Sequence, residues 1–155
     1  MSTRKSILMM HNTGSDDLNV VGDKIKGDSY YGYTDGIHTV QVTYQNFTGG
    51  FGIQGTLSLD PTDDDWFWIR LADASGNCNQ SPYIEYPTDS LNPTGSKAGT
   101  MNRSQGDTGT DAFTFIGNFT YLRAILTRDY IQPPPMPTID NKYYLGQIDR
   151  VLLSI

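Results

Sequence analysis

Three consecutive segments within residues 38–71 alternate apolar and polar side chains with a period of two. In HTVQVTY, one face carries Val40, Val42 and Tyr44; the segments GIQGTLSL and WFWIRL follow, with the acidic turn DPTDDD between them. A period of two is that of a half-buried β-strand, and short breaks make neighbouring strands antiparallel. The pattern therefore predicts an all-β fold, an antiparallel β-sandwich.

The alternation also assigns side chains to the two faces of the later strands. The positions expected in the core are Ile53, Gly55, Leu57, Phe67, Ile69 and Leu71. The opposite face then carries Trp66, Trp68 and Arg70. Two indoles beside a guanidinium are costly on a solvent-facing surface unless something covers them. This face is a candidate contact site for a partner, or it is covered by another segment of the same chain.

The ends of the chain are expected to pair, as terminal strands do in jelly-roll sandwiches. The apolar segment SILMM lies near the start, and the alternating segment GQIDRVLLSI ends the chain. Further strand signals lie at residues 18–25 and 30–33. In YLRAILTRDYI both faces are partly apolar, which predicts a central strand.

Length and charge narrow the class of protein. A chain of 155 residues with 16 Gly, 8 Pro and 10 Tyr suits one domain, residues 1–155, built from short strands and turns. A net charge of -6 with scattered basic residues argues against nucleic-acid binding. Neither a secretion signal nor a long apolar run is present, so we expect a soluble protein made in the cytoplasm, without membrane contact.

Two segments depart from the strand pattern. Residues 72–111 are rich in Gly, Ser, Asn, Thr and Pro, and a loop of this length is functional or ordered by a partner, or else an idle surface loop. Within it, Tyr83 and Tyr86 are candidate contacts. The Pro-rich arm, residues 132–138, includes Pro133, Pro134 and Pro135. Such an arm caps a sheet edge or recognises a partner.

Carboxylates and histidines give little sign of catalysis. The acidic turn holds Asp60, Asp63, Asp64 and Asp65, whose oxygens could bind calcium. The turn lacks the loop length, central Gly and closing Glu of an EF-hand, and Asp before Pro is ordinary turn chemistry. His11 and His38 are the only histidines, and His38 is expected at an edge position. The single Cys78 excludes an internal disulfide, and no nucleophile or phosphate-loop motif occurs. We therefore predict no enzyme and no cofactor.

The string FTGGFGIQGTLSLDPTDDDWFWIRL, with NFTYLRAIL and the ending GQIDRVLLSI, resembles virion structural proteins of large contractile-tailed phages of marine and cyanobacterial hosts. The strand order also looks like a discoidin or carbohydrate-binding jelly-roll. The resemblance to virion proteins implies a non-enzymatic component of a phage particle, in its head, neck, baseplate or tail fibres. Its partners would then be other virion proteins, in a homo-oligomer or symmetric assembly.

The same residues leave a second hypothesis open. A carbohydrate-binding module for host attachment would stack sugar rings on Trp66, Trp68 and Tyr83 or Tyr86, with calcium held at the acidic turn. Fold likeness alone does not establish sugar binding.

Overall fold

The described residues form mainly β-strands, and most strands pair with a strand far away in the sequence. The computed structural model describes residues 6–11, 13, 19–32, 36–72, 83–86, 107–128 and 146–154. Cys78, the prolines at 133–135 and most of the loop 72–111 lie outside the described residues, so the predictions for them stay predictions.

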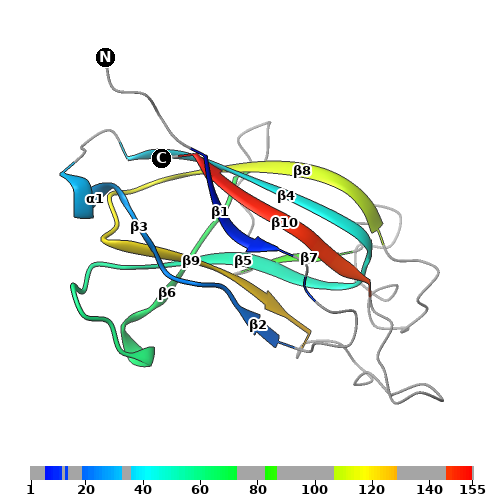
Figure 1. Ribbon diagram of the computed structural model, residues 1–155, viewed down its shortest axis with the longest axis horizontal. Coiled ribbons are helices and arrows are strands. Elements are labelled where there is room, and N and C mark those ends of the chain that lie inside the picture. Colours follow the sequence, from blue (N-terminus) through cyan, green and yellow to red (C-terminus); the bar gives the residue numbers. More distant parts are fainter. Residues whose placement is uncertain are drawn as a thin grey trace.

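The described strands form two antiparallel sheets that pack face to face (Figure 1). In order across the sheet, sheet A contains β1 (Ser6–His11), β10 (Gln147–Ser154), β4 (Ile37–Phe47) and β8 (Asp107–Ile116). Sheet B contains β2 (Asn19–Val21) and β3 (Ile25–Lys26) beside β9 (Tyr121–Thr127), then β5 (Gly49–Thr56), then β6 (Phe67–Ile69) and β7 (Ile84–Tyr86). The only helical turns in the described parts are α1 (Asp28–Tyr31) and η1 (Asp63–Asp65).

The strand pairings are nested along the chain. The first strand, β1, pairs with the last, β10; β2 and β3 pair with β9; β4 pairs with β8; and β5 pairs with β6 and β7. Within the described residues, β2 and β3 share one strand position beside β9, and β6 and β7 share one beside β5, which gives eight strand positions. Nested antiparallel pairing over eight positions is the jelly-roll arrangement. The predictions of an all-β sandwich, paired ends and a central β9 are confirmed.

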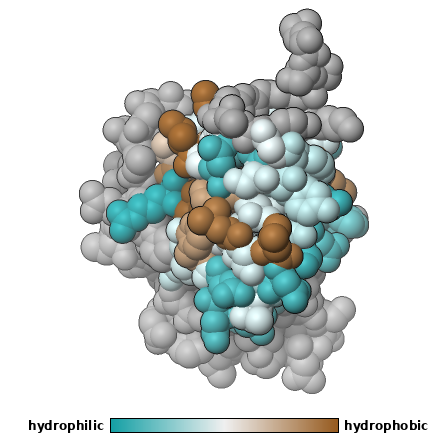
Figure 2. All heavy atoms as spheres, turned by 90° about the vertical axis from the view of Figure 1, so that its left-hand side faces the viewer, coloured by the Kyte–Doolittle hydropathy of each residue, from teal (hydrophilic) through white to brown (hydrophobic). Residues whose placement is uncertain are grey.

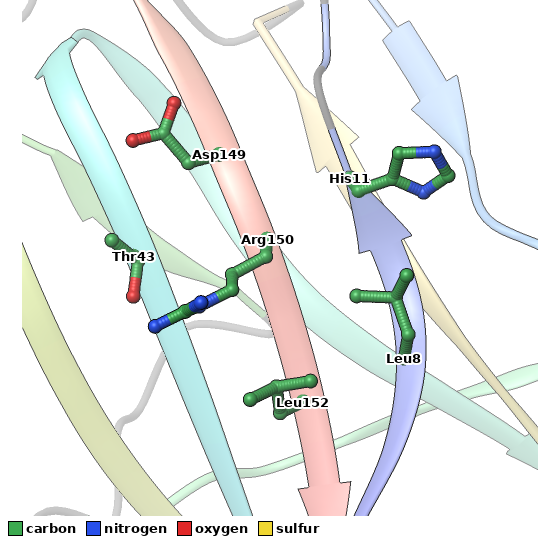
Figure 3. Close-up of a pocket in the computed structure, with 6 residues that line it drawn as sticks. All are labelled: Leu8, His11, Thr43, Asp149, Arg150 and Leu152. Carbon is green, nitrogen blue, oxygen red and sulfur yellow. The ribbon is translucent and has the colours of Figure 1, made fainter.

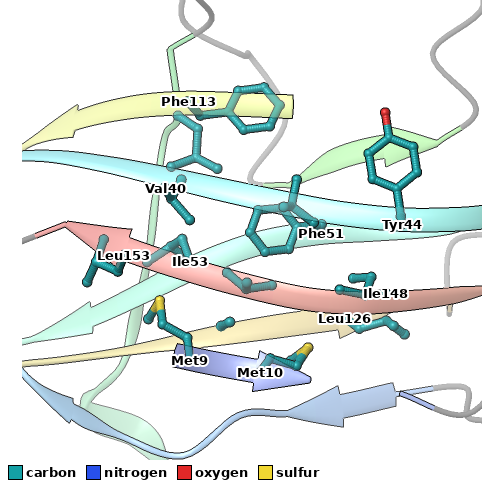
Figure 4. Packing of buried hydrophobic residues seen from close by; sticks show 14 of the residues in the cluster. Met9, Met10, Val40, Tyr44, Phe51, Ile53, Phe113, Leu126, Ile148 and Leu153 are labelled. Carbon is teal, nitrogen blue, oxygen red and sulfur yellow. The ribbon is translucent and has the colours of Figure 1, made fainter. Parts of the chain in front are cut away.

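The core lies between the inner faces of the two sheets (Figure 4). On β4, Val40 and Val42 have no exposed surface, and they face the apolar side chains of β5 and β9. The core residues contributed by the sheet B strands include Phe51, Ile53, Leu122, Ala124 and Leu126. Each fully buried aliphatic or aromatic side chain stabilises the fold by roughly 1.5–3 kcal/mol. The period of two in the sequence therefore identifies the residues that contribute most to stability.

Residues near strand ends depart from the predicted pattern. Ile69 and Leu71 are buried as expected, but Phe67 is 44% and Leu57 is 64% exposed. The prediction for these two residues is wrong because β5 ends at Thr56 and β6 begins at Phe67, so both side chains lie at the rim of the core. Likewise, residues 30–31 form the end of a short helix, not a strand.

His38 is buried and not at an edge, which corrects the prediction from its place in the sequence. It lies on β4, between β10 and β8. Its Nε2 is 3.0 Å from the carbonyl oxygen of Gly117 and 3.7 Å from Oδ2 of the buried Asp28. The backbone N–H of Gly36 donates to the same Asp28 oxygen at 3.1 Å. This polar cluster ties the α1 segment to β4 and to the residue after β8, at the edge of sheet A.

Candidate interaction surface

The predicted tryptophan face lies on the outer side of sheet B, partly covered by neighbours from the same chain. Trp66 and Trp68 are half-buried, whereas Arg70 is exposed. The guanidinium carbon of Arg123 is 4.2 Å from the centre of the Trp66 ring, and the Tyr83 ring centre is 5.7 Å from that of Trp68. The alternative that the same chain covers this face is therefore confirmed in part, since neighbours cover some of each indole, and the contact site stays a prediction.

Two further pairs of a cationic side chain and an aromatic ring lie on this face. Lys26 Nζ lies 4.4 Å from the centre of the Tyr30 ring, and Lys24 Nζ lies 4.7 Å from that of Tyr121. Burial lowers the pKa of Arg123, whose Nε donates to Gln54 Oε1 at 2.9 Å. The sequence analysis missed these pairings, since the alternation on β9 marks Tyr121 and Arg123 as outward but cannot say which strand lies beside them.

Tyr86 is not part of this face. It is fully buried, and its hydroxyl donates to Asp111 Oδ2 at 2.9 Å. The hydroxyl of Tyr44 donates to the same oxygen at 2.7 Å. The prediction of Tyr86 as a partner or glycan contact is therefore wrong, since its ring packs against Tyr44 and Phe47 inside the sandwich.

The burial of Tyr86 makes stability depend on pH. Desolvation, followed by the nearby Asp111 carboxylate, raises the pKa of the phenol above its ordinary value of about 10. The folded state keeps this proton where the unfolded chain loses it, so the stabilisation is complete below about pH 10 and declines as the pH rises further. We expect up to about 1.4 kcal/mol loss per pH unit from this residue.

Urea unfolding between about pH 8 and 11 checks this slope. Tyr86→Phe should show a shallower decline of the unfolding free energy than wild type. Tyr30→Phe, at a ring that is 43% exposed, is the control and should keep the wild-type slope. Equal slopes for all three proteins would contradict the assignment.

In the acidic turn, the carboxylate of Asp65 caps the short helix η1. Oδ2 of Asp65 accepts hydrogen bonds from the backbone N–H of Thr62 at 2.7 Å and from its hydroxyl at 3.2 Å. Among the described residues, no group of three or more His, Cys, Asp or Glu side chains could hold a metal ion. The arrangement at Asp65 is that of a helix cap.

A second surface, which the sequence analysis did not select, lies at the end of the sandwich on the left of Figure 1. We call it the end patch and define it by its exposed apolar residues: Ile37, Leu57, Leu59, Phe67 and Ile116. Figure 2 faces this end and shows apolar side chains gathered there among polar ones. Ile116 is 80% and Leu59 is 77% exposed.

Two members of the end patch pair with each other, and two others contact Phe119 and Thr120. Ile37 and Ile116 are direct cross-strand partners on β4 and β8. The rings of Phe67 and Phe119 have centres 5.7 Å apart, and the Thr120 hydroxyl donates to the Leu57 carbonyl oxygen at 3.1 Å. A cluster of exposed apolar residues on a folded domain is a candidate interaction site. The alternation predicts Leu57 and Phe67 in the core, and this is wrong because only the tertiary structure determines where each strand ends.

Comparison with protein families, curated proteins and solved structures finds no match to this chain. Within the described residues, no helix is long and apolar enough to span a membrane.

Proposed function

We propose that this protein is a non-enzymatic virion structural component of a contractile-tailed bacteriophage. It is made in the host cytoplasm and joins the particle by protein–protein contacts with other virion proteins or with its own copies. The end patch is the observation that supports this proposal, together with the sequence resemblance. Burying apolar surface contributes roughly 25 cal/mol per Å², so a patch of large aliphatic side chains favours association.

The geometry of the end patch suits docking. Its residues sit at strand ends, where the paired strands β4 and β8 and the segment after β5 hold the backbone. A rigid apolar centre with a polar surround is the usual anatomy of a stable interface. Docking through one end would leave the outer faces of both sheets free for other contacts.

Mass spectrometry of purified particles tests the proposal directly, since a structural component is present in stoichiometric amounts. We expect the double substitution Leu59→Asp and Ile116→Asp to lower incorporation roughly tenfold or more, because charge at the patch centre opposes burial. Both side chains are exposed, so the fold should be preserved. Val21→Asp, at a residue that is 57% exposed on β2, is the matched control and should incorporate normally. Absence of the wild-type protein from particles would reject the proposal.

The second candidate function is glycan binding on the outer face of sheet B, supported by the half-buried Trp68 beside Tyr83. An accessible indole can stack on a sugar ring. We expect a glycan-array signal that Trp68→Ala abolishes and that Ile116→Asp, in the end patch, leaves unchanged. A blank array from folded protein would remove this candidate.

A further inference from the structure

The outer face of sheet A has a hollow of about 690 Å³ where β1, β10 and β4 lie side by side. The residues that line it are Leu8, His11, Thr43, Asp149, Arg150 and Leu152 (Figure 3). None of these residues belongs to the end patch or the tryptophan face.

Two β-bulges shape the hollow. The register of β1 against β10 shifts between Leu8 and Met10, and that of β10 against β4 shifts between Ile148 and Arg150. The second shift places Asp149 and Arg150, which are consecutive, together on the lining of the hollow. Bulges of this kind re-aim side chains and are enriched beside functional sites.

The polar groups in the hollow have capacity for a ligand. Arg150 is exposed, and its guanidinium makes no hydrogen bond or ion pair with any part of the chain that the structure describes. Figure 3 shows its side chain reaching over β4 towards Thr43. Oδ1 of Asp149 accepts a hydrogen bond from Gln147 Nε2 at 2.6 Å. An exposed guanidinium such as that of Arg150 can bind a carboxylate through two parallel hydrogen bonds.

The apolar residues lie between the polar ones. Leu8, which is 48% exposed, and its cross-strand partner Leu152 provide an aliphatic floor beside Arg150. A sugar ring has one apolar face, and its hydroxyls can donate to the Asp149 carboxylate or exchange hydrogen bonds with Thr43 and His11. From this combination we infer that the hollow binds an acidic sugar unit, with its carboxylate on Arg150 and its ring on Leu8 and Leu152.

A peptide C-terminus also presents a carboxylate beside an apolar group. It offers no hydroxyls, however, to donate to the Asp149 carboxylate or to exchange hydrogen bonds with Thr43 and His11. The sugar acid is therefore the better match. This inference is independent of the proposed assembly role, because it concerns a different face of the sandwich.

NMR titration of the full chain with methyl glucuronide, methyl glucoside and N-acetyl-leucine tests the inference. The first two share a ring and differ in the carboxylate, and the third represents a peptide C-terminus. We expect amide shifts at Thr43 and Leu152 with the glucuronide, and a dissociation constant at least roughly tenfold higher for the glucoside. Arg150→Gln should weaken glucuronide binding to the level of the glucoside. Ile116→Gln, at an exposed residue of the end patch, is the control and should bind like wild type.

Three results would overturn the inference. Equal binding of glucoside and glucuronide would show that the hollow does not recognise the carboxylate. Equal or tighter binding of N-acetyl-leucine would assign the hollow to a peptide carboxylate. Lack of any shift at β1, β4 and β10 would show that the hollow binds none of these ligands.

Discussion

Gly146→Ala is expected to destabilise the protein by at least about 4 kcal/mol, the largest effect of any single substitution considered. Gly146 precedes β10 with a φ of 74°, in the left-handed region that side chains disfavour. A Cβ at this position would overlap the carbonyl group of Asn46, near the end of β4. Backbone of two segments would have to separate, and both belong to central parts of the sandwich.

Gly32→Ala is the matched control for this prediction. Gly32 has a similar φ of 78°, but nothing lies within 4 Å of the Cβ that an alanine would add. The cost should then be only that of the backbone conformation, about 1–2 kcal/mol. Urea unfolding of both variants measures the difference. Equal destabilisation would show that the close approach of Gly146 to Asn46 is absent in solution.

Arg128→Met is expected to cost about 2–5 kcal/mol, because it removes the hydrogen-bond donors of a buried guanidinium. Arg128 is 1% exposed, immediately after β9. Its Nε donates to the Thr48 carbonyl oxygen at 2.8 Å, and its Nη2 donates to that of Gly146 at 2.9 Å. Methionine is similar in length and apolar, so it fills much of the space while leaving these carbonyl groups without their donor.

Arg70→Met provides the comparison on an exposed arginine and should change the unfolding free energy by no more than about 0.5 kcal/mol. Chemical denaturation measures both changes in the unfolding free energy, provided that this free energy depends on denaturant concentration with the same slope in each protein. If Arg128→Met were as mild as Arg70→Met, the hydrogen bonds to Thr48 and Gly146 would contribute little to the folded state.

These two predictions concern one junction. The turn between β4 and β5, the end of β9 and the start of β10 meet at Arg128 and Gly146. Nothing in the sequence marks this junction, since Gly146 is one of 16 glycines and Arg128 follows an ordinary strand. Its importance comes from backbone groups far apart in the chain that have to share a buried space.

The candidate surfaces could be predicted only in part. The alternation around Trp66 and Trp68 correctly placed both indoles on the outer side of sheet B. It could not reveal that Arg123 lies over Trp66, because the pairing of β5 with β9 brings that residue close. Tyr86 lies in a polar segment, which predicts an exposed contact, but the residue is buried. Its contacts with Asp111 and Tyr44 depend on strands from elsewhere in the chain.

The strand character of this protein, the buried face of β4 and the pairing of the two ends could all be predicted from the sequence. A side-chain period of two is a local property, and the apolar face of a strand must be buried wherever that strand lies. Tertiary structure alone decided the burial of His38, the exposure of Leu57 and Phe67, and the hollow around Arg150. These depend on where strands end and on register shifts between them, which are set by contacts between distant segments of the chain.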